Sequence, residues 1–338
     1  MTFSAMALGI TQTRKQYIAI TSSNPLAGAY EFTSAGFGTR TTAGSGNRPG
    51  SVSAFGVSFN PSNSALSYVG DNNLAVYPWP PTGSNFLTKY ANPATLPNFG
   101  DVGTQFSPSG KVLAIAKSVY AWSSAGFGSK YSDPVLPEFI SDQITFSPSE
   151  DVIVSININS PYVESFAWNN STGFGTRYSN PATLPPGPTT SVAFSPSGND
   201  IALSNVSTGP YITVYPWSSG FGTKYSNPVT TPTNNGQDVE FSPSGNDIAI
   251  AHTTSPSITA YPWTSGSGFG TKYSNPATAV TGNGNCVSFS RTGDVIVVGH
   301  SSSPFMSAYL WTSGSGFGTK FTNPATMPGA GVNTTAFG

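Results

Sequence analysis

The sequence predicts an all-β fold, a seven-bladed β-propeller made of four-stranded antiparallel blades. A motif that begins at a phenylalanine, complete as Phe-Ser-Pro-Ser-Gly at 194–198, recurs in altered form along the whole chain. The motif phenylalanines are Phe59, Phe106, Phe146, Phe194, Phe241, Phe289 and Phe337, and subtraction gives spacings of 47, 40, 48, 47, 48 and 48 residues. A period in this range is typical of repeat architectures. No segment shows the periodicity of an amphipathic helix.

Each repeat contains four segments with the composition of short strands. In the repeat around Phe194, the first strand is expected to end at Phe194 and the second to span 200–204. The third covers 211–217, where β-branched and aromatic residues alternate, and the fourth covers 221–226 before Asn227-Pro228 ends it. Four short antiparallel strands in about 40–50 residues form one propeller blade. One aromatic position recurs once per repeat, as Trp in six repeats and as Phe32 in the first, and it is expected to pack between blades.

The two ends of the chain are expected to share one blade. Residues 16–20, 29–32 and 36–40 match the second, third and fourth strands of the repeat, and residues 334–337 match a first strand. Pairing 14–40 with 334–337 completes a seventh blade and leaves no open sheet edge at the seam. The chain is therefore predicted to form a single propeller domain over residues 1–338.

Charge and composition exclude several classes of partner. Only 8% of the residues are charged and the formal net charge is −1, whereas nucleic-acid binding needs a summed basic field. No run approaches the ~20 apolar residues of a membrane span, so we expect no membrane insertion. The one cysteine, Cys286, excludes an intrachain disulfide and is typical of a small buried residue. A surface of Ser, Thr, Asn and Gly, without a recognisable signal peptide, favours a virion or extracellular location.

The chain resembles the WD-repeat propeller superfamily in residues 194–202 and 241–249 and in the Trp that closes the third strand. It departs from that superfamily because the Gly-His opening is absent and no Asp follows any Trp. The segment Gly-Phe-Gly-Thr-Lys/Arg-Tyr-Ser-Asn-Pro is instead similar to modules of phage-encoded propeller proteins. This resemblance implies a propeller fold and is compatible with a phage gene.

From composition and resemblance together we expect a non-enzymatic interaction or structural propeller. The first hypothesis is a virion (phage) structural, tail or decoration component that presents a docking or receptor-binding surface. Its partners would be other virion proteins or a host-surface glycan or protein. Two alternatives stay open. One is a carbohydrate-binding, lectin-like propeller, which would need Tyr and Trp exposed between blades. The other is a hydrolase or lactonase with its site in the central channel.

The segments that vary between repeats are candidates for binding, because variable loops on a rigid scaffold commonly carry function. They follow the second and fourth strands, and the longest is 44–55. The candidate partner-binding residues are Arg48, Phe55, Asn157, Asn205, His252 and His300. Random drift of these loops explains the variation about as well for any single loop.

A basic residue recurs at one position of every repeat, on the predicted fourth strand. The seven residues are Arg40, Lys89, Lys130, Arg177, Lys224, Lys272 and Lys320. They could form a ring of cations for an acidic partner. We favour a structural role, because Lys or Arg on the outermost strand protects a sheet edge from aggregation.

The inner strands offer little that is typical of catalysis. Gln105, Gln143, Asp238 and Glu240 lie among Ser, Thr and Ala, and acid-base or metal chemistry needs convergent carboxylates or histidines. Asp238 and Glu240 share one face of a strand, and we expect a solvated or hydrogen-bonded pair. No catalytic residue, metal ligand or cofactor is predicted.

Overall fold

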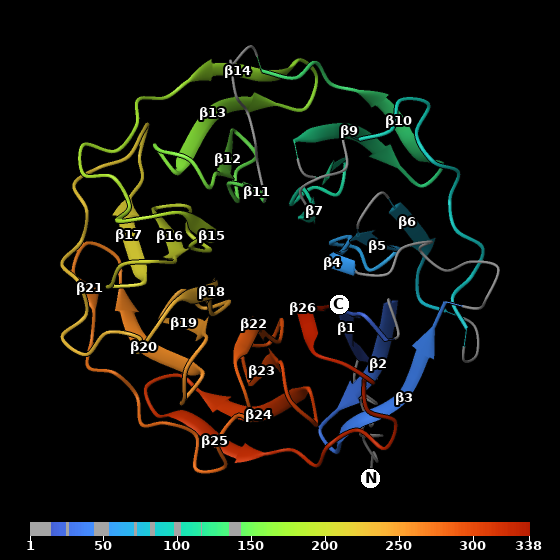
Figure 1. The fold of residues 1–338 in the computed structure, drawn as a ribbon. Helices are drawn as coiled ribbons and strands as arrows, with labels where there is room; N and C mark the ends of the chain where they lie inside the picture. The colour runs from blue at the N-terminus through green and yellow to red at the C-terminus, as the bar shows by residue number, and fades with distance from the viewer. Residues whose placement is uncertain are drawn as a thin grey trace, which may run out of the picture.

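A computed structural model describes residues 15–24, 27–43, 54–70, 73–81, 85–97, 103–115, 117–134 and 143–338. Within these ranges the chain forms seven antiparallel sheets arranged as a ring around a central axis (Figure 1). The all-β fold and the seven blades predicted from the sequence are thus confirmed. No helix in the described part of the chain is long and apolar enough to cross a membrane.

The blades are numbered in chain order, and the strands of each are given from the centre outward. Blade 1 contains β26 (Val332–Phe337), β1 (Gln16–Ser22), β2 (Ala27–Thr33) and β3 (Gly36–Thr42). Blade 2 contains β4 (Ala54–Phe59), β5 (Ala65–Gly70) and β6 (Asn73–Pro78). Blade 3 contains β7 (Thr104–Phe106), β8 (Val112–Ile115), β9 (Ser118–Ser123) and β10 (Gly126–Lys130). Blade 4 contains β11 (Ile144–Phe146), β12 (Val152–Ile156), β13 (Val163–Asn169) and β14 (Gly173–Arg177).

The remaining three blades complete the ring. Blade 5 contains β15 (Thr189–Phe194), β16 (Asp200–Asn205) and β17 (Ile212–Pro216). Blade 6 contains β18 (Gly236–Phe241), β19 (Asp247–His252), β20 (Ile258–Thr264) and β21 (Gly268–Phe269). Blade 7 contains β22 (Gly284–Phe289), β23 (Val295–His300), β24 (Met306–Thr312) and β25 (Gly316–Lys320). The first strands β26, β4, β7, β11, β15, β18 and β22 surround the centre of the ring (Figure 1).

Strand pairing between the chain ends closes the ring. β26 is antiparallel to β1, with Ile18 opposite Phe337 and Ile20 opposite Thr335. This register gives blade 1 its inner strand from the C-terminal segment, as the sequence predicted.

Within the described residues, two blades have three strands in place of the expected four, and a third blade has a fourth strand of only two residues. These are blades 2, 5 and 6, the blades with a proline directly before the tryptophan of the third strand: Pro78, Pro216 and Pro262. Proline has no backbone N–H to donate to a neighbouring strand. In blade 5 the fourth segment is therefore reduced to a single bridge between Trp217 and Phe221.

The hydrophobic core consists of layers between adjacent blades. The layer between blades 5 and 6, for example, joins Val214 of one blade to Val239, Ile250 and Trp263 of the next. The recurring tryptophan is buried in six of the seven layers, and Phe32 takes its place in the layer between blades 7 and 1. The tryptophan ring packs edge-on against an aromatic residue of the preceding blade, as Tyr225 does with Trp263 and Tyr273 with Trp311. Such aromatic contacts add about 0.5–1.5 kcal/mol each beyond their buried area. The repeating Trp therefore has the packing role that the sequence indicated.

Candidate active site in the central channel

The first strands of the blades line a central cavity of about 1160 Å³. Each first strand is the inner edge of its sheet, so one row of its backbone N–H groups has no partner within that sheet. Side chains from the preceding blade accept some of these hydrogen bonds. The pairs are Ser58 Oγ with Phe106 N (3.2 Å), Gln143 Oε1 with Val192 N (3.0 Å), Asp238 Oδ2 with Val287 N (2.9 Å) and Glu240 Oε2 with Phe289 N (2.9 Å).

Asp238 connects the first strands of three blades. Its Oδ1 accepts the Ser191 hydroxyl of β15 at 2.7 Å and the backbone N–H of Val239 at 3.0 Å. Its Oδ2 accepts the Val287 N–H of β22 at 2.9 Å. Both carboxylate oxygens of Asp238 are therefore occupied by donors from the protein.

Glu240 lies two residues further along β18 and so on the same face of the strand. Its Oε2 accepts the Phe289 N–H at 2.9 Å. Its other oxygen has no hydrogen-bond donor among the described residues, and the side chain lines the channel. Glu240 is therefore the carboxyl group of the pair with an oxygen available to a bound molecule.

Both carboxyl groups hold protons more tightly than usual. Burial raises the pKa of Asp238 to about 6, against the hydrogen bonds from Ser191, Val287 and Val239, which lower it. Burial, and then the charge of Asp238, raise the pKa of Glu240 well above its usual value. A raised pKa makes the ionised carboxyl group a stronger base than an ordinary carboxylate, which favours a role in general acid-base catalysis. The sequence placed both residues on one face but could not indicate these pKa values, because they depend on burial by β15 and β22.

Four of the residues proposed from the sequence for partner binding lie inside the molecule. Asn157, Asn205, His252 and His300 are all buried at the ends of the second strands. The Asn157 side chain accepts the N–H of Asn159, and Asn205 donates to the carbonyl of Thr208. These side chains support the loops between second and third strands and do not face solvent.

The other two candidates differ in position. Arg48 and most of the long loop 44–55 lie outside the described residues, as do the segments 98–102 and 138–142, which also vary between repeats. Phe55 is partly buried and lines the central channel. Its carbonyl accepts a hydrogen bond from the Thr334 hydroxyl of β26, which joins blade 2 to blade 1.

Most of the recurring basic residues donate a hydrogen bond to a side chain three residues further along the chain. Lys224 and Lys272 donate to Asn227 and Asn275, each at 2.5 Å. The same three-residue spacing joins Lys130 to Asp133, Arg177 to Asn180 and Lys320 to Asn323, while Arg40 donates to the Met327 carbonyl. The structural role favoured from the sequence stays a prediction. Within the described ranges, Lys89 shows no polar contact of this kind.

No group of three or more His, Cys, Asp or Glu residues gathers at a possible metal site in the part of the chain that the structure describes. Cys286 lies beside the channel but is buried, and burial raises the pKa of its thiol, so it stays protonated. The six tryptophans are buried too, with exposed fractions of 7% or less. The exposed Trp between blades that a lectin-like propeller would need is therefore not found among them.

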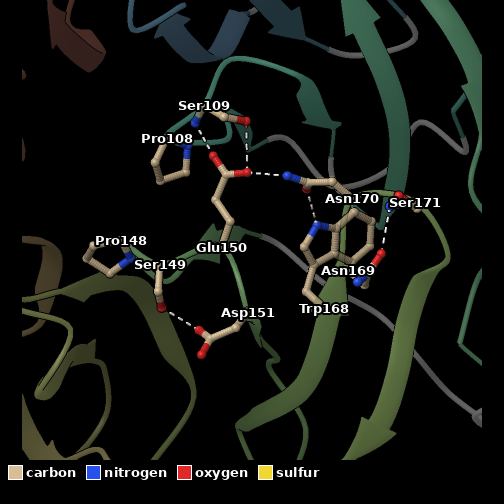
Figure 2. Close-up of a pocket in the computed structure, with 10 residues that line it drawn as sticks. All are labelled: Pro108, Ser109, Pro148, Ser149, Glu150, Asp151, Trp168, Asn169, Asn170 and Ser171. Atoms are coloured by element: carbon tan, nitrogen blue, oxygen red, sulfur yellow. Dashed lines mark hydrogen bonds between the residues drawn. The ribbon is translucent and has the colours of Figure 1, made fainter.

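A second cavity, of about 640 Å³, lies on the surface between blades 3 and 4 (Figure 2). Glu150 replaces the glycine of most repeats here, at a positive φ of 57°. Its carboxylate accepts hydrogen bonds from the backbone and hydroxyl of Ser109 and from Asn170, which also accepts the Trp168 indole N–H (Figure 2). Glu150 thus connects two blades, and its oxygens are already engaged.

No protein-family model and no curated protein matches the sequence. Solved structures with the same fold include the periplasmic gluconolactonase PpgL of Pseudomonas aeruginosa, with a TM-score of 0.69 and 13% identity. That match covers 96% of this chain and 98% of that chain. A protein from Bacteroides uniformis assigned as a 6-phosphogluconolactonase gives a TM-score of 0.71 and 13% identity, over 96% of this chain and 99% of that chain. A similar assignment from Bacteroides fragilis gives 0.69 and 10%, over 97% and 99%.

At 10–13% identity these structures establish the shared propeller fold. They give no support to a relation with WD-repeat or phage-encoded propellers. They also contradict the hypothesis of a non-enzymatic virion component, because these three proteins of the same fold bear the names of lactonases and none of them is a virion protein. That first hypothesis, with its receptor-binding role, is therefore wrong. It overestimated the resemblance of the Gly-Phe-Gly modules and assigned no chemistry to the channel carboxyl groups.

Proposed function

We propose that this protein is a hydrolase that opens lactones of sugar acids in its central channel. The observation that carries the proposal is the Asp238–Glu240 pair, two carboxyl groups of raised pKa on one channel-lining strand. The lactonases that share the fold support the same reaction class. A channel-site hydrolase is one of the two alternatives that the sequence left open, and it needs no residue outside the described part of the channel.

In this proposal Glu240 acts as the general base. Its free oxygen takes a proton from a water molecule, and the water oxygen attacks the lactone carbonyl carbon. The acyl C–O bond of the ring then breaks, and the ring oxygen leaves as an alkoxide that receives the proton back from Glu240. Asp238 remains in its hydrogen bonds. Burial, and then the charge of Asp238, keep the pKa of Glu240 high. General-base catalysis of this kind contributes roughly 10²–10⁴-fold to rate.

We also propose that the protein works outside the cytoplasm. Its low content of charged residues supports this location, as does the periplasmic gluconolactonase among the proteins of the same fold. Fractionation of cells that express the full chain would test the location directly.

The test of function is lactone hydrolysis followed by proton release in a pH-stat, with spontaneous hydrolysis subtracted. We expect Glu240→Gln to lower kcat by about 10²–10⁴-fold. This substitution keeps an amide oxygen that can still accept the Phe289 N–H, so the fold should survive. Lys272→Gln, far from the channel lining, is the matched control and should keep wild-type activity.

The pH profile separates a catalytic role from a structural one. General-base activity should rise with pH above the usual carboxyl range of about 4, because Glu240 must be ionised to act and its pKa is raised. Asp238→Asn removes the neighbouring negative charge, so the rising limb should move to lower pH. Unchanged activity in both variants, or no hydrolysis by the wild type, would contradict the proposal.

A further inference from the structure

The channel has an unusual balance of charge for a site that would bind an anion. Among its described lining residues, only Asp238, Glu240 and Arg291 carry ionisable charge. The others are hydroxyl, amide and apolar side chains, including Gln105, Gln143 and Ser288. The two carboxyl groups lie on β18, on the channel wall itself.

Arg291, the one cation of this set, is held at the rim. It lies in the turn between β22 and β23 of blade 7. Its Nη1 donates to the Pro61 carbonyl at 2.9 Å and its Nη2 to Asn63 Oδ1 at 2.8 Å, both in blade 2. The guanidinium spans blade 1, which has no turn between first and second strands because those strands come from opposite ends of the chain. Its terminal nitrogens are thus engaged with protein oxygens.

From this distribution we infer that the channel selects uncharged, polyhydroxylated lactones and discriminates against lactones that carry a phosphate or carboxylate group. The inference rests on the proposed function and specifies its substrate class. Hydroxyl groups of such a substrate match the Ser, Thr and Gln side chains of the wall. In the ionised form of the site, which the reaction requires, an anionic substituent would face the Asp238 and Glu240 carboxylates. No free cation among the described wall residues would balance it.

The same charge distribution favours product release. Hydrolysis adds water across the acyl C–O bond and yields a hydroxy acid, which loses its proton to solvent at neutral pH and becomes an anion. Like charges then repel the product from the channel. We therefore expect the open-chain hydroxy acid to be a weak inhibitor, with an inhibition constant far above the KM of the lactone.

The experiment compares glucono-1,5-lactone with its 6-phosphate on the wild-type protein. We expect kcat/KM to be about 100-fold lower for the phosphorylated lactone. Raising the salt concentration should narrow the difference, because the opposing charges are partly screened. Equal or higher kcat/KM for the phosphorylated lactone would overturn the inference.

A lysine introduced into the channel wall can be compared with a lysine introduced outside the channel. Gln105 occupies in blade 3 the position of Glu240 in blade 6, directly before the motif phenylalanine, and it lines the channel. Gln105→Lys should raise kcat/KM for the phosphorylated relative to the neutral lactone by about 10-fold. Ser171→Lys adds the same charge at an exposed turn and should leave that ratio unchanged. Identical ratios in the two variants would contradict the placement of selectivity in the channel.

Binding of non-hydrolysable lactams separates this inference from the proposed function. Calorimetry with gluconolactam and its 6-phosphate measures charge selection without catalysis. If no lactone is hydrolysed but the neutral lactam binds more tightly, the reaction is wrong and the selectivity holds. If lactones are hydrolysed and the phosphorylated lactam binds as well as the neutral one, the selectivity is wrong and the reaction holds. Absence of lactam binding would overturn the inference.

Discussion

At the end of the second strand, His252 and His300 occupy the position that Asn157 and Asn205 occupy in blades 4 and 5. Each histidine Nε2 lies within hydrogen-bond distance of a hydroxyl on the third strand, Thr259 at 2.9 Å for His252 and Ser307 at 3.0 Å for His300. In the blades with asparagine, the equivalent hydroxyls of Ser165 and Thr213 are buried without a partner in the described structure. The longer side chain therefore completes a contact that the shorter one cannot reach.

Replacing His252 by Asn should change stability in opposite directions at neutral and acid pH. At pH 7.5 we expect a loss of about 1 kcal/mol, because Thr259 loses its partner. Burial lowers the pKa of His252 in the folded protein to about 4. The histidine therefore makes its full contribution to the free energy of unfolding above pH 6.5, the approximate pKa in the unfolded chain. This contribution is lost as the pH falls below that value. At pH 5 the unfolded chain protonates His252 and the folded protein does not, which lowers the stability of the wild type by about 2 kcal/mol. The variant lacks this penalty and should then be the more stable protein by about 1 kcal/mol.

Urea unfolding at the two pH values measures this difference. Asp238 and Glu240 also titrate over part of this pH range, and because their pKa values are raised in the folded protein, they stabilise it as the pH falls. Both residues are present in the wild type and in the variant, so their effect cancels in the comparison. His300→Asn should reproduce the result, because burial lowers the pKa of His300 to about 4 as well. A variant that is less stable by the same amount at both pH values would show that the pKa of His252 is not lowered in the folded protein.

Between neighbouring blades, the aromatic residues and their polar partners vary together. Asp247 of β19 is fully buried and accepts hydrogen bonds from the Tyr273 hydroxyl (2.6 Å) and the Trp311 indole (3.3 Å). Val295 holds the position of Asp247 in blade 7. There the equivalent aromatic residues are Phe321 and Phe32, neither of which has a donor. Polar and apolar versions of one interface thus occur in the same molecule.

This variation predicts strongly coupled effects of substitution. Asp247→Val alone should destabilise the protein by about 3 kcal/mol, because it leaves two buried donors without an acceptor. The triple variant with Tyr273→Phe and Trp311→Phe copies the interface at Val295 and should recover most of that loss. Unfolding free energies of the single, double and triple variants measure the coupling. Additive losses, with the triple variant the least stable, would show that Asp247 acts independently of the two aromatic residues.

The strands of each blade could be predicted from the sequence in part. The four-strand pattern of each repeat is predictable, because turn residues and alternating strand residues recur at fixed intervals. Pro78 and Pro216 indicate either a bulge or the end of pairing with the fourth strand, and the sequence alone does not distinguish the two. In the described part of blades 2 and 5 the fourth strand is absent. A proline weakens pairing to an extent that depends on the neighbouring strand, so its consequence cannot be deduced from its own segment alone.

For the molecule as a whole, the fold follows from what the repeats share and the candidate site from where they differ. The repeat period is sufficient to predict the number of blades. Asp238 and Glu240 occur in one repeat only, and their raised pKa values arise from burial among two other blades, which contribute Ser191, Val287 and Phe289. Such contacts between distant segments leave no local pattern in the sequence.

The C-terminal strand β26 closes the ring of blades. It pairs with β1 in blade 1, and its buried Val332 and Phe337 pack in the core between blades 7 and 1. Removing residues 331–338 should leave β1 as an unpaired edge and open the core between blades 7 and 1. We expect a lower Tm and concentration-dependent aggregation. Thr334 and Thr335 also leave the channel wall, so lactone hydrolysis should be lost with them.

Adding the missing strand back as a peptide distinguishes loss of closure from general damage. A synthetic peptide of residues 330–338 should restore Tm in proportion to its concentration, because it binds only the folded form. The same peptide with Phe337→Asp should fail, since a charge would enter the layer that holds Ile18 and Phe32. If the truncated chain melts as the full chain does and stays monomeric, β26 does not hold the ring closed. Recovery with both peptides would show that strand pairing alone, without the Phe337 side chain, is sufficient for closure.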